Sequence, residues 1–350
     1  MPPKKGKAKA KGGGGDSDEP GYNHAAFVAD YQKYAKSIAV PVHPGVVEQL
    51  VGSDEDKTEM FAKSKALVVS DEHPLGPGGC RALATAILGL GPEMKTGPFR
   101  CIEKIRVWGG KIGDDGAESL AELLRLGGGE VKLTYLELLN CGVGARGAGS
   151  IGAALAVGGN LSLLTLKLDY NTALGGLGVR ALCRGLRTNS TLQQLHLSYC
   201  GIHPDGGAPL GELLSFTKLG LQRLALQGNK LGGEGLSAIA KGLARSASLV
   251  QIELADNAID ATEEDTAALA EFAAAAVACP TLANIDLLYN RIGVSGGEAL
   301  RPIVTTAGKN ISELLVDATL PEPLFDELCK FGGGGKKKKG GKKGGKKKKK

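Results

Sequence analysis

Residues 221–231 read LQRLALQGNKL, and the spacing of their apolar residues decides the fold. Apolar side chains stand at offsets 0, 3, 5 and 10 from the first leucine, and an asparagine stands at offset 8. Residues 192–202, LQQLHLSYCGI, show the same spacing with cysteine at offset 8. Alternating apolar residues predict a strand with one buried face. Repetition at a fixed period indicates that each copy is one structural unit.

Copies of this pattern follow one another between residues 102 and 292. Their starts lie 31, 30, 29, 29, 28 and 33 residues apart, at Ile102, Leu133, Leu163, Leu192, Leu221, Leu249 and Leu282. A degenerate copy with Val68 on its strand precedes the series, and a half-copy, Ile311-Leu314-Val316, follows it. We therefore expect the chain to be a linear stack of repeats.

A helical pattern follows each predicted strand. Apolar residues at i, i+3 and i+7, such as Leu236, Ile239 and Leu243, predict one face of a helix. A glycine precedes these patterns, and we expect it to let the chain turn tightly from strand into helix. The glycines are Gly116, Gly178, Gly235 and Gly296. Stacking such strand–helix units buries the apolar faces that neither element could bury alone.

Offset 8 of the repeat holds a polar residue that should point into the core. This position contains Asn171, Asn229, Asn257 and Asn290, with Cys141 and Cys200 in two other copies and Gly110 in the first. A buried polar side chain is tolerated when it hydrogen-bonds to backbone groups of neighbouring turns. Asparagine does this well and cysteine more weakly, and the copy with glycine should lack the side-chain bond.

The repeats resemble the ribonuclease-inhibitor-like class of leucine-rich repeats, because many are 28 to 29 residues long and have a full helix with a G-[AV]-x-x-L pattern. The resemblance implies an α/β solenoid, a horseshoe with a parallel concave sheet and convex helices. We expect this solenoid over residues 65–330 and an N-terminal helical cap over residues 21–64, with a helix near Tyr22 to Val40. The alternative for that helix is a docking element for a partner.

Positive charge is concentrated at the two ends of the chain. The formal net charge is +6, but residues 1–20 hold five lysines and three acids, and residues 336–350 hold eleven lysines and no acid. The remainder carries 27 basic and 34 acidic residues, so it is acidic. Residues 1–20 and 331–350 are too poor in apolar residues to fold, and we expect disordered Lys/Gly tails.

The C-terminal tail should attract polyanions such as acidic tubulin tails, with strong salt dependence. The lysines expected to make these contacts are Lys336, Lys337, Lys338, Lys339, Lys346, Lys347, Lys348, Lys349 and Lys350. Lysine without arginine or aromatic residues does not favour specific nucleic-acid recognition. A nuclear localisation signal and a solubilising tail without a single partner are the alternatives.

The sequence contains no motif for catalysis, cofactor binding or metal binding. We find no Walker loop, nucleophile elbow or metal-ligand spacing, so we expect no enzyme activity, cofactor or metal. No secretory signal or membrane-spanning run is recognisable. The seven cysteines are scattered, which favours reduced thiols in the cytoplasm or nucleus.

The concave face is the predicted partner-binding surface, because alternate strand side chains point out of the sheet. The expected binding residues are Lys104, Arg106, Trp108, Tyr135, Lys167, Tyr170, Tyr199, Arg223, Glu253, Asp256, Asp286 and Tyr289. Their charge changes from basic to acidic along the chain, and their aromatic residues line one edge. Exposed aromatics and arginine dominate binding hot spots. The alternative is that the rings are partly buried against neighbouring turns.

These features predict a non-enzymatic scaffold or adaptor. The N-terminal MPPKKGKAKAKG and the Lys/Gly terminus around such repeats look like subunits of ciliary or flagellar axonemes, as in radial-spoke or dynein-regulatory complexes. This resemblance implies a cytoplasmic, axonemal location, with the nucleus as the alternative. A Ran-type GTPase activator shares the repeat type but carries an acidic C-terminal tail. A ribonuclease-inhibitor-like regulator or an immune sensor is the remaining alternative.

Overall fold

The computed structural model describes residues 23–92, 94–156, 158–308 and 311–329. Nine strands in this part of the chain form one parallel sheet and lie side by side in sequence order. They are β1 Ala66–Val69, β2 Lys104–Trp108, β3 Tyr135–Leu139, β4 Thr165–Lys167, β5 Gln194–His196, β6 Arg223–Ala225, β7 Gln251–Glu253, β8 Asn284–Asp286 and β9 Glu313–Leu315. Every predicted copy, the degenerate copy and the half-copy therefore contain a strand, as the sequence predicts.

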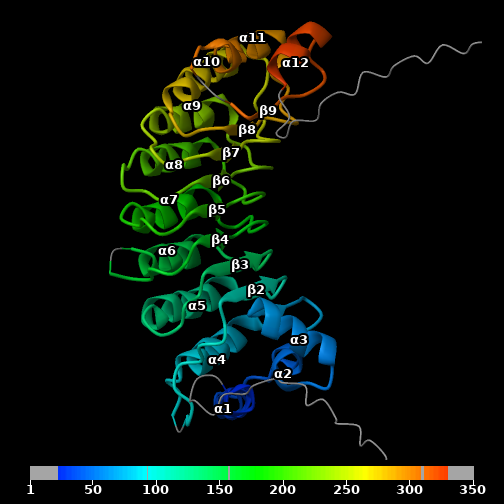
Figure 1. The fold of residues 1–350 in the computed structure, drawn as a ribbon, viewed down its shortest axis with the longest axis vertical. Coiled ribbons are helices and arrows are strands. Elements are labelled where there is room, and N and C mark those ends of the chain that lie inside the picture. Colours follow the sequence, from blue (N-terminus) through cyan, green and yellow to red (C-terminus); the bar gives the residue numbers. More distant parts are fainter. Residues whose placement is uncertain (1–22, 93, 157, 309–310, 330–350) are drawn as a thin grey trace, which may run out of the picture.

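The helices that follow the strands stack along one side of the sheet, so the molecule is an open arc with the strands on its inner side (Figure 1). They are α4 Gly76–Leu88, α5 Gly113–Gly127, α6 Ala145–Ala154, α7 Gly175–Leu186, α8 Gly207–Leu214, α9 Gly232–Leu243, α10 Glu263–Ala278 and α11 Gly293–Thr305. A 3₁₀ turn, Pro204–Gly206, precedes α8, and α12, Glu322–Leu328, follows β9. The predicted α/β solenoid with a parallel concave sheet and convex helices is confirmed.

The apolar repeat positions form one continuous core between the sheet and the helices. Leu221, Leu224, Leu226 and Leu231 of the stretch quoted first are all buried. Their counterparts in the neighbouring repeats stack beside them, because Leu224 pairs in register with Leu195 and with the equivalent isoleucine of β7. Burying such side chains contributes roughly 1.5–3 kcal/mol each, which makes the stack the main source of stability.

The glycines predicted to turn the chain into the helices have a different role. The positive φ angles belong to glycines three residues earlier, such as Gly113 (φ 59°) and Gly232 (φ 58°), which begin the helices. Gly116 lies inside the first turn of α5, where an added Cβ would stand 2.5 Å from the Cβ of Ile112. The prediction was therefore wrong about the mechanism: these glycines let the helix pack closely on the turn before it.

The predicted asparagine ladder is present, and each described asparagine bridges two repeats. Oδ1 of Asn171 accepts hydrogen bonds from the backbone N–H groups of Cys141 (2.9 Å) and Val143 (3.0 Å). Its Nδ2 donates to the carbonyls of Leu138 and Leu168, both at 2.7 Å. Asn229 and Asn290 repeat this arrangement. These three asparagines satisfy the buried backbone of the turn before them, whereas Oδ1 of Asn257 has no hydrogen-bond partner among the described residues.

Cysteine completes the ladder less fully, as expected. The thiol of Cys141 donates to the carbonyl of Val107 (3.2 Å), and that of Cys200 donates to the carbonyl of Leu168 (3.0 Å). Burial raises the pKa of Cys141 to about 11 and that of Cys200 to about 12, so both thiols stay protonated near neutral pH. Both cysteines therefore have a structural role in the turns that follow their strands.

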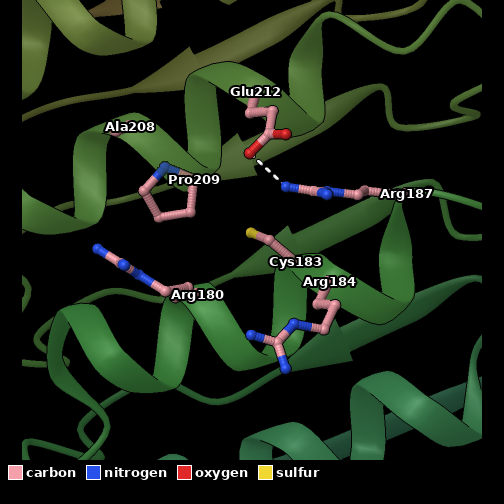
Figure 2. A pocket seen from close by; sticks show the side chains of 7 residues that line it. All are labelled: Arg180, Cys183, Arg184, Arg187, Ala208, Pro209 and Glu212. Carbon is pink, nitrogen blue, oxygen red and sulfur yellow. Dashed lines mark ion pairs between the residues drawn. The ribbon is translucent and has the colours of Figure 1, made fainter.

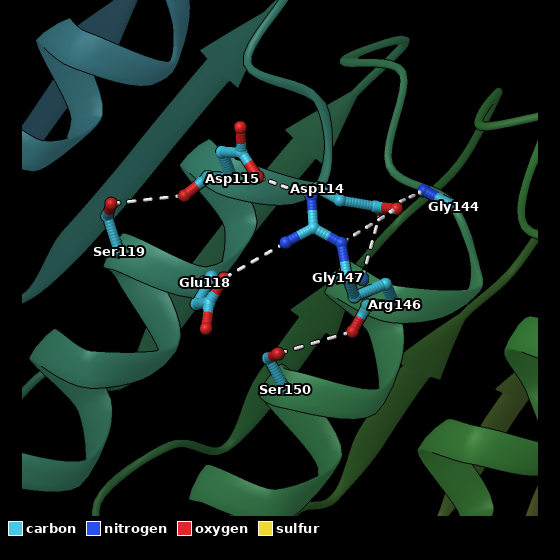
Figure 3. A network of polar contacts seen from close by, with 8 residues as sticks. All are labelled: Asp114, Asp115, Glu118, Ser119, Gly144, Arg146, Gly147 and Ser150. Carbon is cyan, nitrogen blue, oxygen red and sulfur yellow. Dashed lines mark hydrogen bonds and ion pairs between the residues drawn. The ribbon is translucent and has the colours of Figure 1, made fainter.

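Neighbouring helices are also linked on the outer side of the arc (Figure 3). Oδ1 of Asp114 in α5 accepts from the backbone N–H groups of Gly144 (2.7 Å) and Gly147 (2.9 Å) at the start of α6. Arg146 of α6 reaches back to Asp115 and to Glu118 (3.1 Å). A carboxylate at a helix N-terminus complements the helix dipole, so this contact fixes how one helix begins against the next.

Between residue 23, where the description begins, and the first strand, the structure has three helices: α1 His24–Ser37, α2 Pro44–Val51 and α3 Glu55–Ser64. The first lies within the predicted helix and stacks its Phe27 ring on Phe99 at 4.2 Å. The side chain of Gln49 in α2 hydrogen-bonds to both backbone groups of Val68, at 2.9 Å and 2.6 Å. Helix α2 therefore satisfies the backbone groups of Val68 on the open edge of β1.

Candidate functional site

Two rows of outward-facing side chains cross the concave face, because the strand register aligns every second residue with its counterpart on the next strand. One row contains Lys104, Tyr135, Thr165, Gln194, Arg223, Gln251, Asn284 and Glu313. The other contains Arg106, Glu137, Lys167, His196, Ala225, Glu253, Asp286 and Leu315. Seven of the predicted binding residues lie in these rows, and Trp108 ends β2.

The N-terminal half of the face holds a cluster of cations around one tyrosine ring. The guanidinium carbon of Arg106 lies 5.0 Å from the ring centroid of Tyr135, and Nζ of Lys167 lies 5.9 Å from it. The Tyr135 hydroxyl donates to Oε2 of Glu137 (2.9 Å), which also lies 3.5 Å from Nε of Arg106. Burial, then Glu137, raises the pKa of Tyr135 to about 12. The ring is held as a neutral platform between two cations.

The C-terminal half is acidic, but two of the predicted binding residues in it, Arg223 and Glu253, form an ion pair with each other. Arg223 donates to Oε1 of Glu253 from Nε (2.8 Å), and a second guanidinium nitrogen lies 2.6 Å away. These two side chains therefore form one unit and do not act as independent contacts. Asp286 is half-buried, and burial, followed by the nearby Glu253, Glu313 and Asp317, raises its pKa. Like charges accumulate at this end of the sheet.

The middle of the face contains a buried imidazole. His196 is 7% exposed, and its Nε2 has no hydrogen-bond partner among the described residues. Burial, then the cations Lys167 and Arg223, lowers its pKa to about 4. The sequence places His196 at an outward position, which is correct, but long neighbours cover it. A neutral, covered centre therefore separates the basic half from the acidic half.

Tyr170, Tyr199 and Tyr289, which we call the tyrosine ridge, stand in the turns after β4, β5 and β8. The rings of Tyr170 and Tyr199 stack with centroids 4.7 Å apart and planes 8° from parallel. The Tyr199 ring also covers Gly228, where a side chain would collide with it. Tyr170 is 49% exposed and Tyr289 is 68% exposed. The expectation that these rings form an exposed edge fits two of them, while Tyr199 is partly buried.

All three ridge tyrosines have left-handed backbones, with φ of 63°, 55° and 60°. The same turn position holds Gly109, Asn140, Gly228 and Asp256 in other repeats, and each of these also has a positive φ. Glycine, asparagine and aspartate adopt this conformation readily, whereas a bulky residue is strained there. Sequence reasoning missed this strain, although the recurrence of such residues seven positions after each repeat start was the available signal.

Comparison with known proteins agrees with the repeat architecture. A family model described as Leucine Rich repeat matches residues 159–183, 188–211 and 221–240. The ribonuclease inhibitor of Mus musculus is 32% identical over 139 residues, and that of Sus scrofa is 32% identical over 165 residues. The repeats of this chain are therefore leucine-rich repeats that are similar to those of ribonuclease inhibitors. The matched segments cover 38% and 47% of this leucine-rich-repeat protein, but only 28% and 34% of the two inhibitors.

Two solved structures match part of this leucine-rich-repeat protein with low TM-scores and little sequence identity. The tropomodulin C-terminal domain of Caenorhabditis elegans has a TM-score of 0.37 and 11% identity, and the match covers 45% of this chain and 88% of that domain. The leiomodin-1 actin-binding site 2 has a TM-score of 0.34 and 12% identity, and the match covers 41% of this chain and 78% of the other.

The helical side of this leucine-rich-repeat protein has a shallow hollow of about 370 Å³ between α7 and α8 (Figure 2). Arg180, Arg184 and Arg187 line it, and Arg187 pairs with Glu212. Burial raises the pKa of Cys183 at its floor to about 12. The thiol is therefore not a nucleophile near neutral pH.

The described ranges contain no group of three or more His, Cys, Asp or Glu side chains that could hold a metal ion. Within those ranges, every helix is too short or too polar to cross a membrane. The predicted polyanion-binding lysines, residues 336–350, lie outside the part of the chain that the structure describes.

Proposed function

We propose that this leucine-rich-repeat protein is a non-enzymatic adaptor that holds a partner protein against its concave face. The tyrosine ridge carries this proposal. A left-handed backbone costs a bulky residue roughly 1–2 kcal/mol, and Tyr170 and Tyr289 gain little burial in return. The turn has a positive φ in every full repeat, but the fold does not require a bulky side chain there, because glycine, asparagine and aspartate fill the same position in other repeats. Backbone strain of this kind is typical of functional positions, and tyrosine is one of the residue types that dominate binding hot spots.

Replacing Tyr170 and Tyr289 by asparagine tests the ridge. Asparagine stands at the equivalent position in another repeat, Asn140, with a φ of 51°, so the double variant should fold. Leu177→Asn, at an exposed position on α7, is the matched control on the helical side. Tagged full-length proteins would capture partners from native material, and those partners would be purified and titrated. We expect the ridge variant alone to lose affinity; equal binding by all three proteins would refute the ridge's role.

We further propose that the assembly is a ciliary or flagellar axonemal complex of the radial-spoke or dynein-regulatory type. An acidic body with lysine-rich ends supports an adaptor that touches an acidic lattice such as tubulin with its tails. The test is co-sedimentation of the full chain with microtubules over a range of salt concentrations. Binding should weaken as salt rises and should be lost on deleting residues 336–350. Equal binding by the truncated protein would refute the role of the tail.

A ribonuclease-inhibitor-like regulator is the second candidate, because the relatives named ribonuclease inhibitor align at 32% identity. The acidic half of the concave face, with Glu253, Asp286 and Glu313, would suit a basic partner. Inhibition of a basic ribonuclease by the full chain, lost in Asp286→Asn, would favour this candidate over the axonemal one. Undiminished ribonuclease activity in the presence of excess protein would exclude it.

A further inference from the structure

A cleft of about 480 Å³ lies where the N-terminal helices meet the concave face, and we call it the junction cleft. Helices α2 and α3 form one wall, and β1, β2 and the turn after β1 form the other. Its lining residues include Met60, Phe61, Val68, Trp108, His43 and Arg106. Arg106 and Trp108 also belong to the concave face, so the cleft continues the surface proposed above to bind a protein.

The walls of the junction cleft are apolar and partly open to solvent. Met60 of α3 is 65% exposed and Trp108 of β2 is 37% exposed, although both are large hydrophobic side chains. Val68 of β1 and the buried Phe61 of α3 also line the cleft. Large apolar side chains that gather around one concave site favour an apolar ligand group. One aromatic or branched side chain would fit among them.

Two buried polar atoms of the lining, Nδ1 of His43 and Nε of Arg106, have no hydrogen-bond partner among the described residues. His43 is 7% exposed, and its Nε2 lies 2.6 Å from the carbonyl oxygen of His73. A carbonyl only accepts, so Nε2 carries the proton and Nδ1 is an acceptor. This Nδ1 is buried and has no hydrogen-bond partner within the described ranges. Burial also lowers the pKa of His43, which keeps the ring neutral. The wall therefore offers an acceptor to a ligand N–H group.

The charges around the cleft favour an acidic ligand. Lys57 and Arg106 line it with one carboxylate, Glu72, but Lys57 already pairs with Asp54 at 3.3 Å, so Arg106 is the cation that remains for a ligand. Arg106 lies 3.5 Å from Glu137, a separation too long for a good hydrogen bond. Its Nε is buried without a hydrogen-bond partner among the described residues, so the guanidinium retains a donor for a ligand.

We propose that the junction cleft binds an extended acidic segment of a partner protein. An aromatic or branched side chain of the segment packs against Trp108 and Met60, a neighbouring carboxylate pairs with Arg106, and a backbone N–H donates to Nδ1 of His43. This inference rests on the proposed protein-binding role of the concave face and adds the recognition element at its N-terminal end.

The chain itself supplies the reporter, because Trp108 is its only tryptophan. A random peptide library would be selected on the full-length protein, and the enriched peptides would be titrated while tryptophan emission is recorded. We expect these peptides to share an aromatic or aliphatic residue next to aspartate or glutamate and to shift the emission of Trp108. Enriched peptides without this pattern, or no enrichment, would overturn the proposal.

Variants separate the cleft from the rest of the concave face. Met60→Glu, at an exposed position, should weaken the selected peptides at least tenfold, whereas Leu177→Glu on α7 should leave their affinity unchanged. Equal peptide affinity for the Met60 variant would refute the cleft. The asparagine variants of Tyr170 and Tyr289 should keep peptide binding, because they lie on other strands' turns. If the ridge variants still bind the captured partner protein with full affinity while Met60→Glu no longer binds the selected peptides, the ridge proposal fails and the cleft proposal stands.

A segment of the chain itself is the competing occupant. Residues 16–22, DSDEPGY, combine acids with a tyrosine and precede α1, whose His24 ring lies 5.4 Å from the Phe61 ring. Replacing the three acids by their amides and Tyr22 by serine in the full chain tests this occupant. Unchanged Trp108 emission without peptide supports an external partner. A shift of that emission, with stronger binding of the selected peptides, would assign the cleft to the chain's own segment and overturn the proposal.

Discussion

The ladder asparagine Asn171 should be one of the most costly single residues to replace. Its side chain is buried and makes four hydrogen bonds of 3.0 Å or less to backbone groups of two repeats. Asn171→Leu keeps the number and branching of the side-chain heavy atoms but leaves two backbone donors, those of Cys141 and Val143, and the Leu138 carbonyl without a side-chain partner. The carbonyl of Leu168 keeps the thiol of Cys200 as a donor. An unsatisfied buried group costs about 1–3 kcal/mol. With about 1 kcal/mol for each of these three groups, the loss is roughly 3 kcal/mol, a large part of the ~5–15 kcal/mol that stabilises a typical protein.

The matched control is Asn171→Cys, because the chain already uses cysteine at this position in two repeats. A thiol can still donate one hydrogen bond, as that of Cys200 does, so we expect a loss of roughly half that of the leucine variant. Urea unfolding followed by circular dichroism measures both. Native-state hydrogen exchange should show lost protection at the amides of Cys141 and Val143. A leucine variant as stable as wild type, or more stable than the cysteine variant, would refute the reasoning.

Three further predictions follow from packing, burial and titration. Gly116→Ala should destabilise the protein by about 1–3 kcal/mol despite the better helix propensity of alanine, because its Cβ would meet Ile112 at 2.5 Å; Gly129→Ala, with open space around it, should not lower the melting temperature. His196 has a pKa lowered from 6.5 to about 4, so the unfolded chain binds the extra proton between these values. Stability should fall as pH drops from about 6.5 to 4, and a pH series of unfolding curves on wild type and His196→Gln should show a shallower fall in the variant. Of the seven thiols, those of Cys101 and Cys329 are partly exposed and the others buried; a maleimide should label these two first, and uniform labelling of all seven in the native protein would contradict the burial.

The fold was predictable because the repeat leaves the same signal many times. The residues at offsets 3 and 5, such as Leu224 and Leu226, alternate with outward residues, and a single register satisfies every copy. The ladder could also be anticipated, because a polar residue recurs at a position that the apolar pattern places inside.

The candidate site was less predictable, because its properties depend on neighbours across strands. Sequence gives the direction in which Arg223 and Glu253 point, but not that they pair. It places His196 outward, but not beneath its long neighbours. The junction cleft is formed by α2 and α3, which lie outside the repeat, so no periodic signal positions Met60 against Trp108.

Because the strands pair in an unbroken series from β1 to β9, the spacing between neighbouring repeats on the concave face is fixed. Neighbouring strands of a sheet lie about 4.8 Å apart, so the eight steps from β1 to β9 span roughly 38 Å. A helix rises 1.5 Å per residue, and a partner helix of about 25 residues would match that span. The number of repeats thus determines the length of partner that the concave face can contact from end to end. A partner whose contact groups are spaced to reach both the cations of β2 and the acids of β8 would be selected by length as well as by charge.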